Sequence, residues 1–171
     1  MNLIKYVIML LFCNLIRLAR VIPNFDPIMG SMLPFAKQDK WYESALFSGI
    51  TIISFDTLTG LVGIWTVVTA ITYAALGVLF HTYYKNKSVD LKMYIASGVV
   101  GVLIYDLVTG VLAGPVLFGG SYYEAFIGQI PFTIYHLVSV AIFILLITPL
   151  LDKHVITNPR LEDIRLLSYK I

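Results

Sequence analysis

Residues 122–151 read YYEAFIGQIPFTIYHLVSVAIFILLITPLL, and this stretch decides the fold. Its only charged side chain is Glu124. A helix needs roughly 20 mostly apolar residues to cross about 30 Å of hydrocarbon, so this stretch is long enough to span a bilayer. Pro131 should bend the helix without preventing it from spanning. The stretch therefore predicts a membrane protein built of helices.

The composition of the whole chain agrees with this prediction. Of the 171 residues, 58% are hydrophobic and 13% are charged, and the mean hydropathy is +0.85. Soluble domains usually carry about 25% charged residues, so these values argue against a disordered chain and against a soluble enzyme domain. One cysteine excludes an intrachain disulfide and a thiolate metal cluster. A net charge of +2 is too small to indicate a nucleic-acid binder.

Five apolar segments are long enough to span, and a sixth is shorter. The short segment, 27–36, would lie as a half-helix against its neighbours, because buried backbone groups need no lipid contact. We therefore expect an all-α membrane protein with six transmembrane helices arranged as three parallel hairpins, over residues 1–153. The longer predicted segments are 3–19, 41–59, 61–84, 91–113 and 122–151.

The basic residues predict the orientation of these helices. If the short segment counts as a crossing, ten of the twelve lysines and arginines lie on one side. By the positive-inside rule this side is cytoplasmic, and it holds both termini. Only Arg17 and Arg20 remain outside. The polar residues 154–171 are predicted to form a cytoplasmic tail with a short amphipathic helix, which either lies on the membrane or docks on a partner.

A six-residue pattern occurs three times along the chain. The copies are FDPIMG at 25–30, FDTLTG at 55–60 and YDLVTG at 105–110. The predicted helices place all three at the outer face, where each hairpin would turn. The glycines suit the left-handed conformation found just past a helix end, and the aromatic residues suit the membrane interface.

The aspartates of this pattern are the least expected residues of the chain. A charged residue at membrane depth costs about 2.5–3.5 kcal/mol and usually faces a cavity or a partner. Asp26, Asp56 and Asp106 have two possible roles. They either form a structural ion-pair network with Arg17 and Arg20, or at least one of these charged groups contacts a ligand directly.

Other polar residues recur at helical spacing within apolar segments. Gln129, Thr133 and His136 share a stripe, which either faces a cavity or forms hydrogen bonds between helices. Trp65 and Thr69 share a face, which either packs against another helix or forms an aromatic wall for a flat organic ligand.

Small residues also recur at this spacing and allow helices to approach closely. One such row is Ala70, Ala74 and Gly77, and another is Ser97 and Gly101. These rows indicate either packing within the molecule or a surface for a partner.

The chain lacks the common catalytic and nucleotide-binding motifs. It has no His-Glu-x-x-His, no Gly-x-Ser-x-Gly and no Gly-x-x-x-x-Gly-Lys. We therefore expect no enzymatic activity, no cofactor and no metal. If the chain takes part in energised transport, other subunits must hydrolyse the ATP.

Several stretches carry a family resemblance. They are RVIPNFDP at 20–27, FGG at 118–120, IGQIPFTIYHL at 127–137 and TPLL at 148–151. Together with the six-helix layout, they resemble the substrate-binding S component of an energy-coupling factor (ECF) transporter, in an uncharacterised prokaryotic subgroup. The resemblance covers most of residues 3–153.

The resemblance implies a binding site near the outer face. It also implies a location in the plasma membrane of a prokaryote, and assembly with a shared transmembrane coupling subunit and two ATPase subunits. The family usually couples through Ala-x-x-x-Ala on the first helix, which this chain lacks. Arg17 belongs to the candidate set through the ion-pair reasoning above. The remaining candidate substrate-binding residues are Asn24, Asp26, Asp56, Trp65, Asp106, Gln129 and His136.

The resulting functional hypothesis is an ECF-type import subunit that captures a small vitamin-like organic nutrient at the outer face. One alternative is a membrane scaffold that transports nothing, which would pack its aspartates without a pocket. The other is an intramembrane enzyme that uses an aspartate or His136 as acid or base, which would need an adjacent nucleophile or metal.

Overall fold

The structure is a computed structural model that describes residues 3–19, 24–38 and 40–152. Within these ranges the chain forms helices and contains no strand. The helices are α1 (Leu3–Ala19), α2 (Ile28–Gln38), α3 (Trp41–Thr59), α4 (Ile64–Tyr84), α5 (Leu91–Asp106), the π-helix η1 (Leu107–Ala113), α6 (Gly114–Phe118) and α7 (Tyr122–Leu151).

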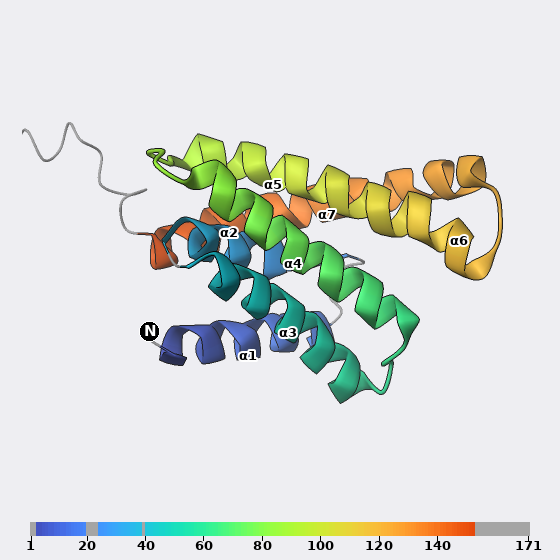
Figure 1. Cartoon of the computed structure of the whole chain (residues 1–171), viewed down its shortest axis with the longest axis horizontal. Helices are drawn as coiled ribbons and strands as arrows, with labels where there is room; N and C mark the ends of the chain where they lie inside the picture. Colours follow the sequence, from blue (N-terminus) through green and yellow to red (C-terminus); the bar gives the residue numbers. More distant parts are fainter. Residues whose placement is uncertain (1–2, 20–23, 39, 153–171) are drawn as a thin grey trace, which may run out of the picture.

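The long helices run roughly side by side along one axis of the molecule (Figure 1). The chain passes back and forth along this axis, and the start of α1 and the end of α7 lie at the same end. The predicted bounds 3–19, 41–59 and 122–151 coincide with α1, α3 and α7. Helix α4 begins three residues later than predicted, because Leu61–Gly63 form the turn after α3.

The short helix α2 lies in the interior of the bundle. Ile28, Met29 and Met32 are fully buried, and α2 packs against α3, α4, α5 and α7. Gly30 permits this burial, because a Cβ added there would come within 2.9 Å of the backbone of Phe143 in α7. As predicted, the short segment lies against its neighbours as a half-helix.

One predicted hairpin turn is in the wrong place. The fifth helix does not turn at Asp106–Gly110 but continues through η1 and α6 to Phe118. The chain reverses at Gly119 and Gly120, which have φ angles of 78° and 114°. Of the three pattern glycines, only Gly60 has a positive φ, 72°, and ends a helix. The prediction that the pattern glycines adopt the left-handed conformation just past a helix end was therefore wrong for Gly30 and Gly110, which lie inside helices.

Three helices in the described part of the chain are long and apolar enough to cross a membrane. They are Ile64–Tyr84, the continuous stretch Leu91–Phe118, and Tyr122–Leu151. Helix α1 has 17 residues and α2 has 11. The chain thus has the character of a helical membrane protein.

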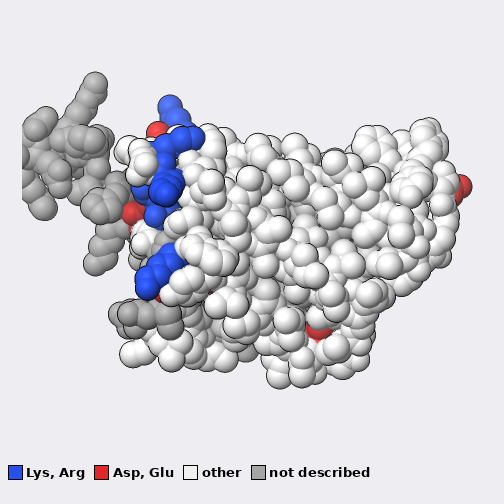
Figure 2. Space-filling model, viewed as in Figure 1, with Lys and Arg blue, Asp and Glu red and all other residues white. Residues whose placement is uncertain are grey.

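The two ends of the bundle differ in charge. Lysines occur at the start of α1 and α5, at the end of α2, ahead of α3 and after α4, which all lie at one end of the molecule. Figure 2 shows this basic end, with most of the visible face free of charge. Arg17 lies in the last turn of α1, towards the opposite end. Arg20 and the predicted amphipathic helix in 154–171 lie outside the described residues.

Candidate functional site

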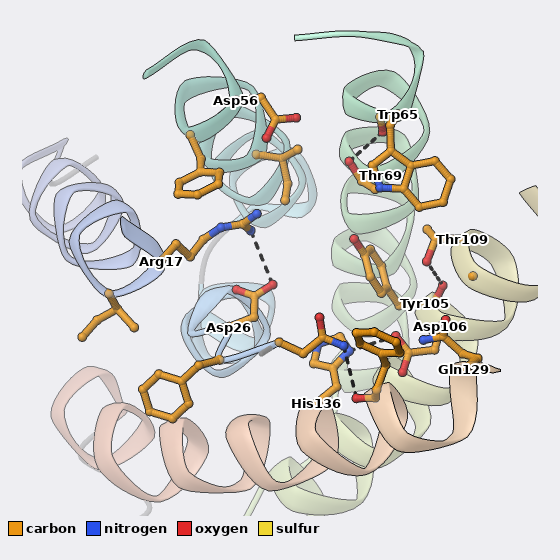
Figure 3. A pocket seen from close by; sticks show the side chains of 17 residues that line it. Arg17, Asp26, Asp56, Trp65, Thr69, Tyr105, Asp106, Thr109, Gln129 and His136 are labelled. Atoms are coloured by element: carbon orange, nitrogen blue, oxygen red, sulfur yellow. Dashed lines mark hydrogen bonds and ion pairs between the residues drawn. The ribbon is translucent and has the colours of Figure 1, made fainter. Parts of the chain in front are cut away.

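A pocket of about 630 Å³ lies towards the end of the bundle opposite the lysines. Its walls come from α1, α3, α4, α5, η1 and α7, and from the segment that leads into α2 (Figure 3). Pockets for small organic ligands usually measure about 300–1,000 Å³, so this one has the size for such a molecule.

All eight residues predicted to form the site line this one pocket. The structure therefore brings together side chains that are up to 119 positions apart in the sequence, while their contact with a ligand stays a prediction. The eight residues are Arg17, Asn24, Asp26, Asp56, Trp65, Asp106, Gln129 and His136.

The repeated sequence pattern supplies much of the lining. Each copy contributes its aromatic residue as well as its aspartate, so Phe25, Phe55 and Tyr105 also line the pocket. That these aromatic residues also lie at the membrane interface stays a prediction. The copies nevertheless differ locally, because the first spans the start of α2, the second ends α3 and the third spans the junction of α5 and η1.

Asp26 is held by contacts to four parts of the chain. Its Oδ1 accepts a hydrogen bond from the backbone N–H of Ile28 at 2.9 Å, where α2 begins. Its Oδ2 accepts one from the Tyr73 hydroxyl at 2.8 Å and lies 3.5 Å from Nη1 of Arg17. Its backbone N–H donates to Ser139 at 2.8 Å. The Asp26 side chain is thus engaged by contacts within the protein itself.

Arg17 is engaged on two sides as well. Besides the contact with Asp26, its guanidinium carbon lies 4.3 Å from the centre of the Phe55 ring, in a cation–π arrangement. The predicted ion pair between outer charges is therefore present in the form Arg17–Asp26. Asp56 and Asp106 have different partners.

Asp56 makes fewer contacts. Its Oδ2 accepts a hydrogen bond from the Thr66 hydroxyl at 2.6 Å, and Thr66 in turn accepts from the backbone N–H of Gly63. These bonds tie the end of α3 to the start of α4 across the turn at Gly60. In the described part of the chain, no other hydrogen bond to this carboxylate is present.

Asp106 and His136 form a buried pair. Nδ1 of His136 lies 2.9 Å from Oδ1 of Asp106, and each residue is 3% exposed. The other polar atom of each side chain, Oδ2 of Asp106 and Nε2 of His136, is buried without a hydrogen-bond partner among the described residues. Buried polar atoms in native proteins are nearly always paired, so these two atoms are suited to hydrogen bonds that the described residues do not supply.

The π-helix η1 begins directly after Asp106. Such segments are rare and often occur at functional sites. Thr109 and Gly110 of η1 line the pocket, and Gly110 leaves the space that the Gln129 side chain occupies. Gln129 and His136 therefore face the pocket from the predicted stripe on α7, whereas Thr133 does not line it.

Several residues that support the site were not predicted as part of it. Tyr73 and Ser139 hold Asp26, and Thr66 holds Asp56. Tyr105 packs on Tyr73 with the ring centres 4.5 Å apart, and on His136 at 5.6 Å. The position of Tyr105 beside Asp106 in the sequence pattern was the available signal. Residues 3–19, 24–38 and 40–152 contain no group of three or more His, Cys, Asp or Glu side chains that could hold a metal ion.

No protein-family model matches the chain, and neither a curated protein nor a solved structure matches it. The functional argument therefore depends on the sequence and on the geometry of the pocket.

Proposed function

We propose that the chain is the substrate-binding subunit of an ECF-type importer, and that the pocket captures a small organic nutrient. The observation that carries this proposal is the pocket of about 630 Å³, which is lined by all eight residues expected to bind the substrate. A short second helix packed inside a bundle of longer helices supports the same proposal.

The proposed orientation places the lysine-rich end in the cytoplasm, with six crossings arranged as three hairpins and both termini inside. The pocket then opens towards the outer face, where an import subunit meets its substrate. The chain contains no nucleotide-binding motif, so the coupling subunit and two ATPases would supply the energy. The membrane would be the plasma membrane of a prokaryote.

The two alternatives fit the pocket less well. A scaffold that transports nothing was expected to pack its aspartates without a cavity, and a cavity lies beside all three. An enzyme finds some support in the pair of His136 and Asp106, because a carboxylate often orients a catalytic histidine. However, no described Ser, Thr or Cys side chain forms a hydrogen bond with Nε2 of His136, so this pair lacks a nucleophile.

The proposal is tested by identifying what the protein carries. The full chain is purified in mild detergent, and small molecules released by denaturation are identified by mass spectrometry. An Asp106→Asn variant, purified in parallel, separates pocket ligands from molecules bound to detergent. A small molecule enriched with the wild-type chain and depleted from the variant supports a binding subunit.

Coupling to partners is tested separately by uptake. The identified molecule is supplied in labelled form to cells that express the chain with or without an ECF coupling subunit and its ATPases. Uptake only in the presence of all subunits supports an ECF importer. Uptake by the chain alone, or ATP hydrolysis by the purified chain alone, would contradict it.

A further inference from the structure

The atoms without partners at the pocket are hydrogen-bond acceptors. An ionised carboxylate can only accept, so Nδ1 of His136 must donate its proton to Oδ1 of Asp106. In a neutral imidazole Nε2 then carries a lone pair and can only accept. With His136 neutral, Oδ2 of Asp106 and Nε2 of His136 are therefore two buried acceptors, and both lack a donor among the described residues.

The charge of the pocket also favours a ligand that donates hydrogen bonds, because it favours a cation. Its described lining contains one arginine and three aspartates, which gives a net charge of −2 with the aspartates ionised and His136 in the neutral form described above. The described part of the lining therefore carries excess negative charge. Charged groups at membrane depth usually face a partner of opposite charge, and the described part of the lining holds no second lysine or arginine.

The one arginine of the described lining already has partners within the protein. Arg17 lies 3.5 Å from Asp26 and stacks over Phe55. An anionic ligand would have to displace these contacts and would also face two further carboxylates. Asp56 and Asp106, in contrast, make no ion pair with a lysine or arginine among the described residues, and so they remain available to a cationic ligand.

Aromatic rings complete the environment that such a ligand needs. Trp65 and Tyr105 line the pocket on α4 and α5. Aromatic faces attract cations, with tryptophan the strongest. The pocket already uses this contact once, between Arg17 and Phe55.

We propose that the molecule bound in this pocket is an organic cation with N–H donors, such as an ammonium or amidinium group on a flat apolar body. Its N–H groups donate to Oδ2 of Asp106 and Nε2 of His136, and Asp56 supplies a second negative charge. This inference rests on the proposed function, because it treats the pocket as the substrate site and names the class of substrate.

Four small probes of similar shape test the proposal on the purified full chain in detergent. Benzamidine carries an amidinium with N–H donors, benzamide is its neutral counterpart, benzoate is an anion, and phenyltrimethylammonium is a cation without N–H. Trp41 lies at the other end of the bundle from Trp65, so a Trp41→Phe background leaves Trp65 as the only tryptophan. Binding is then followed by Trp65 fluorescence and by titration calorimetry.

We expect benzamidine to bind, and benzamide, benzoate and phenyltrimethylammonium to bind at least about tenfold more weakly, since each lacks a charge or donor that the pocket requires. Equal affinity for benzamidine and benzamide, or no measurable binding of benzamidine, would overturn the proposal. Equal binding of phenyltrimethylammonium would overturn the role of the two acceptors. Tighter binding of benzoate would reverse the assigned charge.

Variants then identify the counter-ion. Asp106→Asn keeps an oxygen for His136 but removes the charge, and should weaken benzamidine binding about tenfold to a hundredfold. Glu124→Gln removes one negative charge from an exposed position on α7 outside the pocket and should leave binding unchanged. Equal losses in the two variants would show a general charge effect and overturn the site. Asp56→Asn, which should also weaken binding, covers the case in which Asp106→Asn fails to fold.

The outcomes also separate this inference from the proposed function. A neutral or anionic molecule that co-purifies and enters cells only with the coupling subunits would overturn the cation and leave the importer standing. Benzamidine binding that depends on Asp106, without uptake of any cation when all subunits are present, would overturn the importer and leave the cation-binding site standing.

Discussion

Asp26 contacts more of the molecule than either of the other pocket aspartates. Its two carboxylate oxygens accept hydrogen bonds from Ile28 and Tyr73, and one of them also pairs with Arg17. Asparagine offers a single oxygen, so Asp26→Asn must give up part of this set. Asp26 is therefore placed to stabilise the fold, whatever else it contributes to the pocket.

We expect Asp26→Asn to lower the free energy of unfolding by about 1.5–3 kcal/mol, the usual contribution of a hydrogen bond to a charged group. Asp56→Asn is the matched control, because asparagine can still accept from Thr66, the one hydrogen bond shown for that carboxylate. Thermal unfolding of both variants in the same detergent gives the comparison. A melting temperature that falls equally in both would mean that Asp26 has no special structural role.

Gly110 affects the pocket through the Gln129 side chain, which packs against it. A Cβ at this position would overlap the end of the Gln129 side chain, which is flexible and can move away. We therefore expect Gly110→Ala to change stability little but to displace Gln129 and weaken benzamidine binding several-fold. Gly128→Ala is the control, since nothing lies within 4 Å of an added Cβ there. Binding that changes equally in both variants would exclude the displacement of Gln129 as the cause.

At the scale of the elements, α3 and α4 approach each other closely at Gly77. A Cβ there would come within 2.9 Å of the backbone nitrogen of Ala45, and backbone cannot move away as a side-chain end can. The row Ala70, Ala74 and Gly77 therefore packs within the molecule, against α3. In the second row, Gly101 contacts Met29 and Phe80, so it too packs internally.

We expect Gly77→Ala to destabilise the protein by about 1–3 kcal/mol through overpacking. Gly49→Ala tests the same interface, but its Cβ would meet Ala70 and Ala74 at ordinary distances of 3.8 and 3.9 Å. Alanine favours a helix over glycine by about 1 kcal/mol, so this control should be neutral or stabilising. Melting temperatures of the two variants provide the measurement, and a loss in Gly49→Ala as large as in Gly77→Ala would contradict the packing argument.

At the scale of the whole molecule, the described lysines lie at one end (Figure 2), and the pocket lies towards the other. Because positive charge is retained in the cytoplasm, this asymmetry predicts how the protein sits in its membrane. Ser88, between α4 and α5, lies at the basic end, and Ser121, ahead of α7, lies at the opposite end. Both are exposed.

We expect a cysteine at position 121 to react with an impermeant thiol reagent in intact cells, and a cysteine at position 88 to react only after permeabilisation. The background is Cys13→Ala, which removes the single native thiol, itself buried. Ser121 caps α7 through the N–H of Tyr123, so its replacement should cost about 1 kcal/mol without changing the orientation. The opposite labelling pattern would overturn the proposed topology.

The sequence by itself determined the helical character, most helix bounds and eight of the residues that line the pocket. Spanning segments follow from the length of apolar runs, which is a local property of the chain. Charged residues in an apolar background must face one another, a cavity or water, and this requirement is why Asp26, Asp56 and Asp106 could be predicted from sequence to form ion pairs or to contact a ligand.

Only the tertiary structure decided which partner each aspartate has. The three copies of the pattern are alike in sequence, yet Asp26 pairs with Arg17 and Tyr73, Asp56 with Thr66 and Asp106 with His136. These partners come from other helices, and their distances depend on how the helices pack. The roles of Gly30 and Gly110 were decided in the same way, because close contact with α7 rather than a local turn requires a glycine there. Such contacts cannot be predicted from local sequence, because they depend on residues that are distant along the chain.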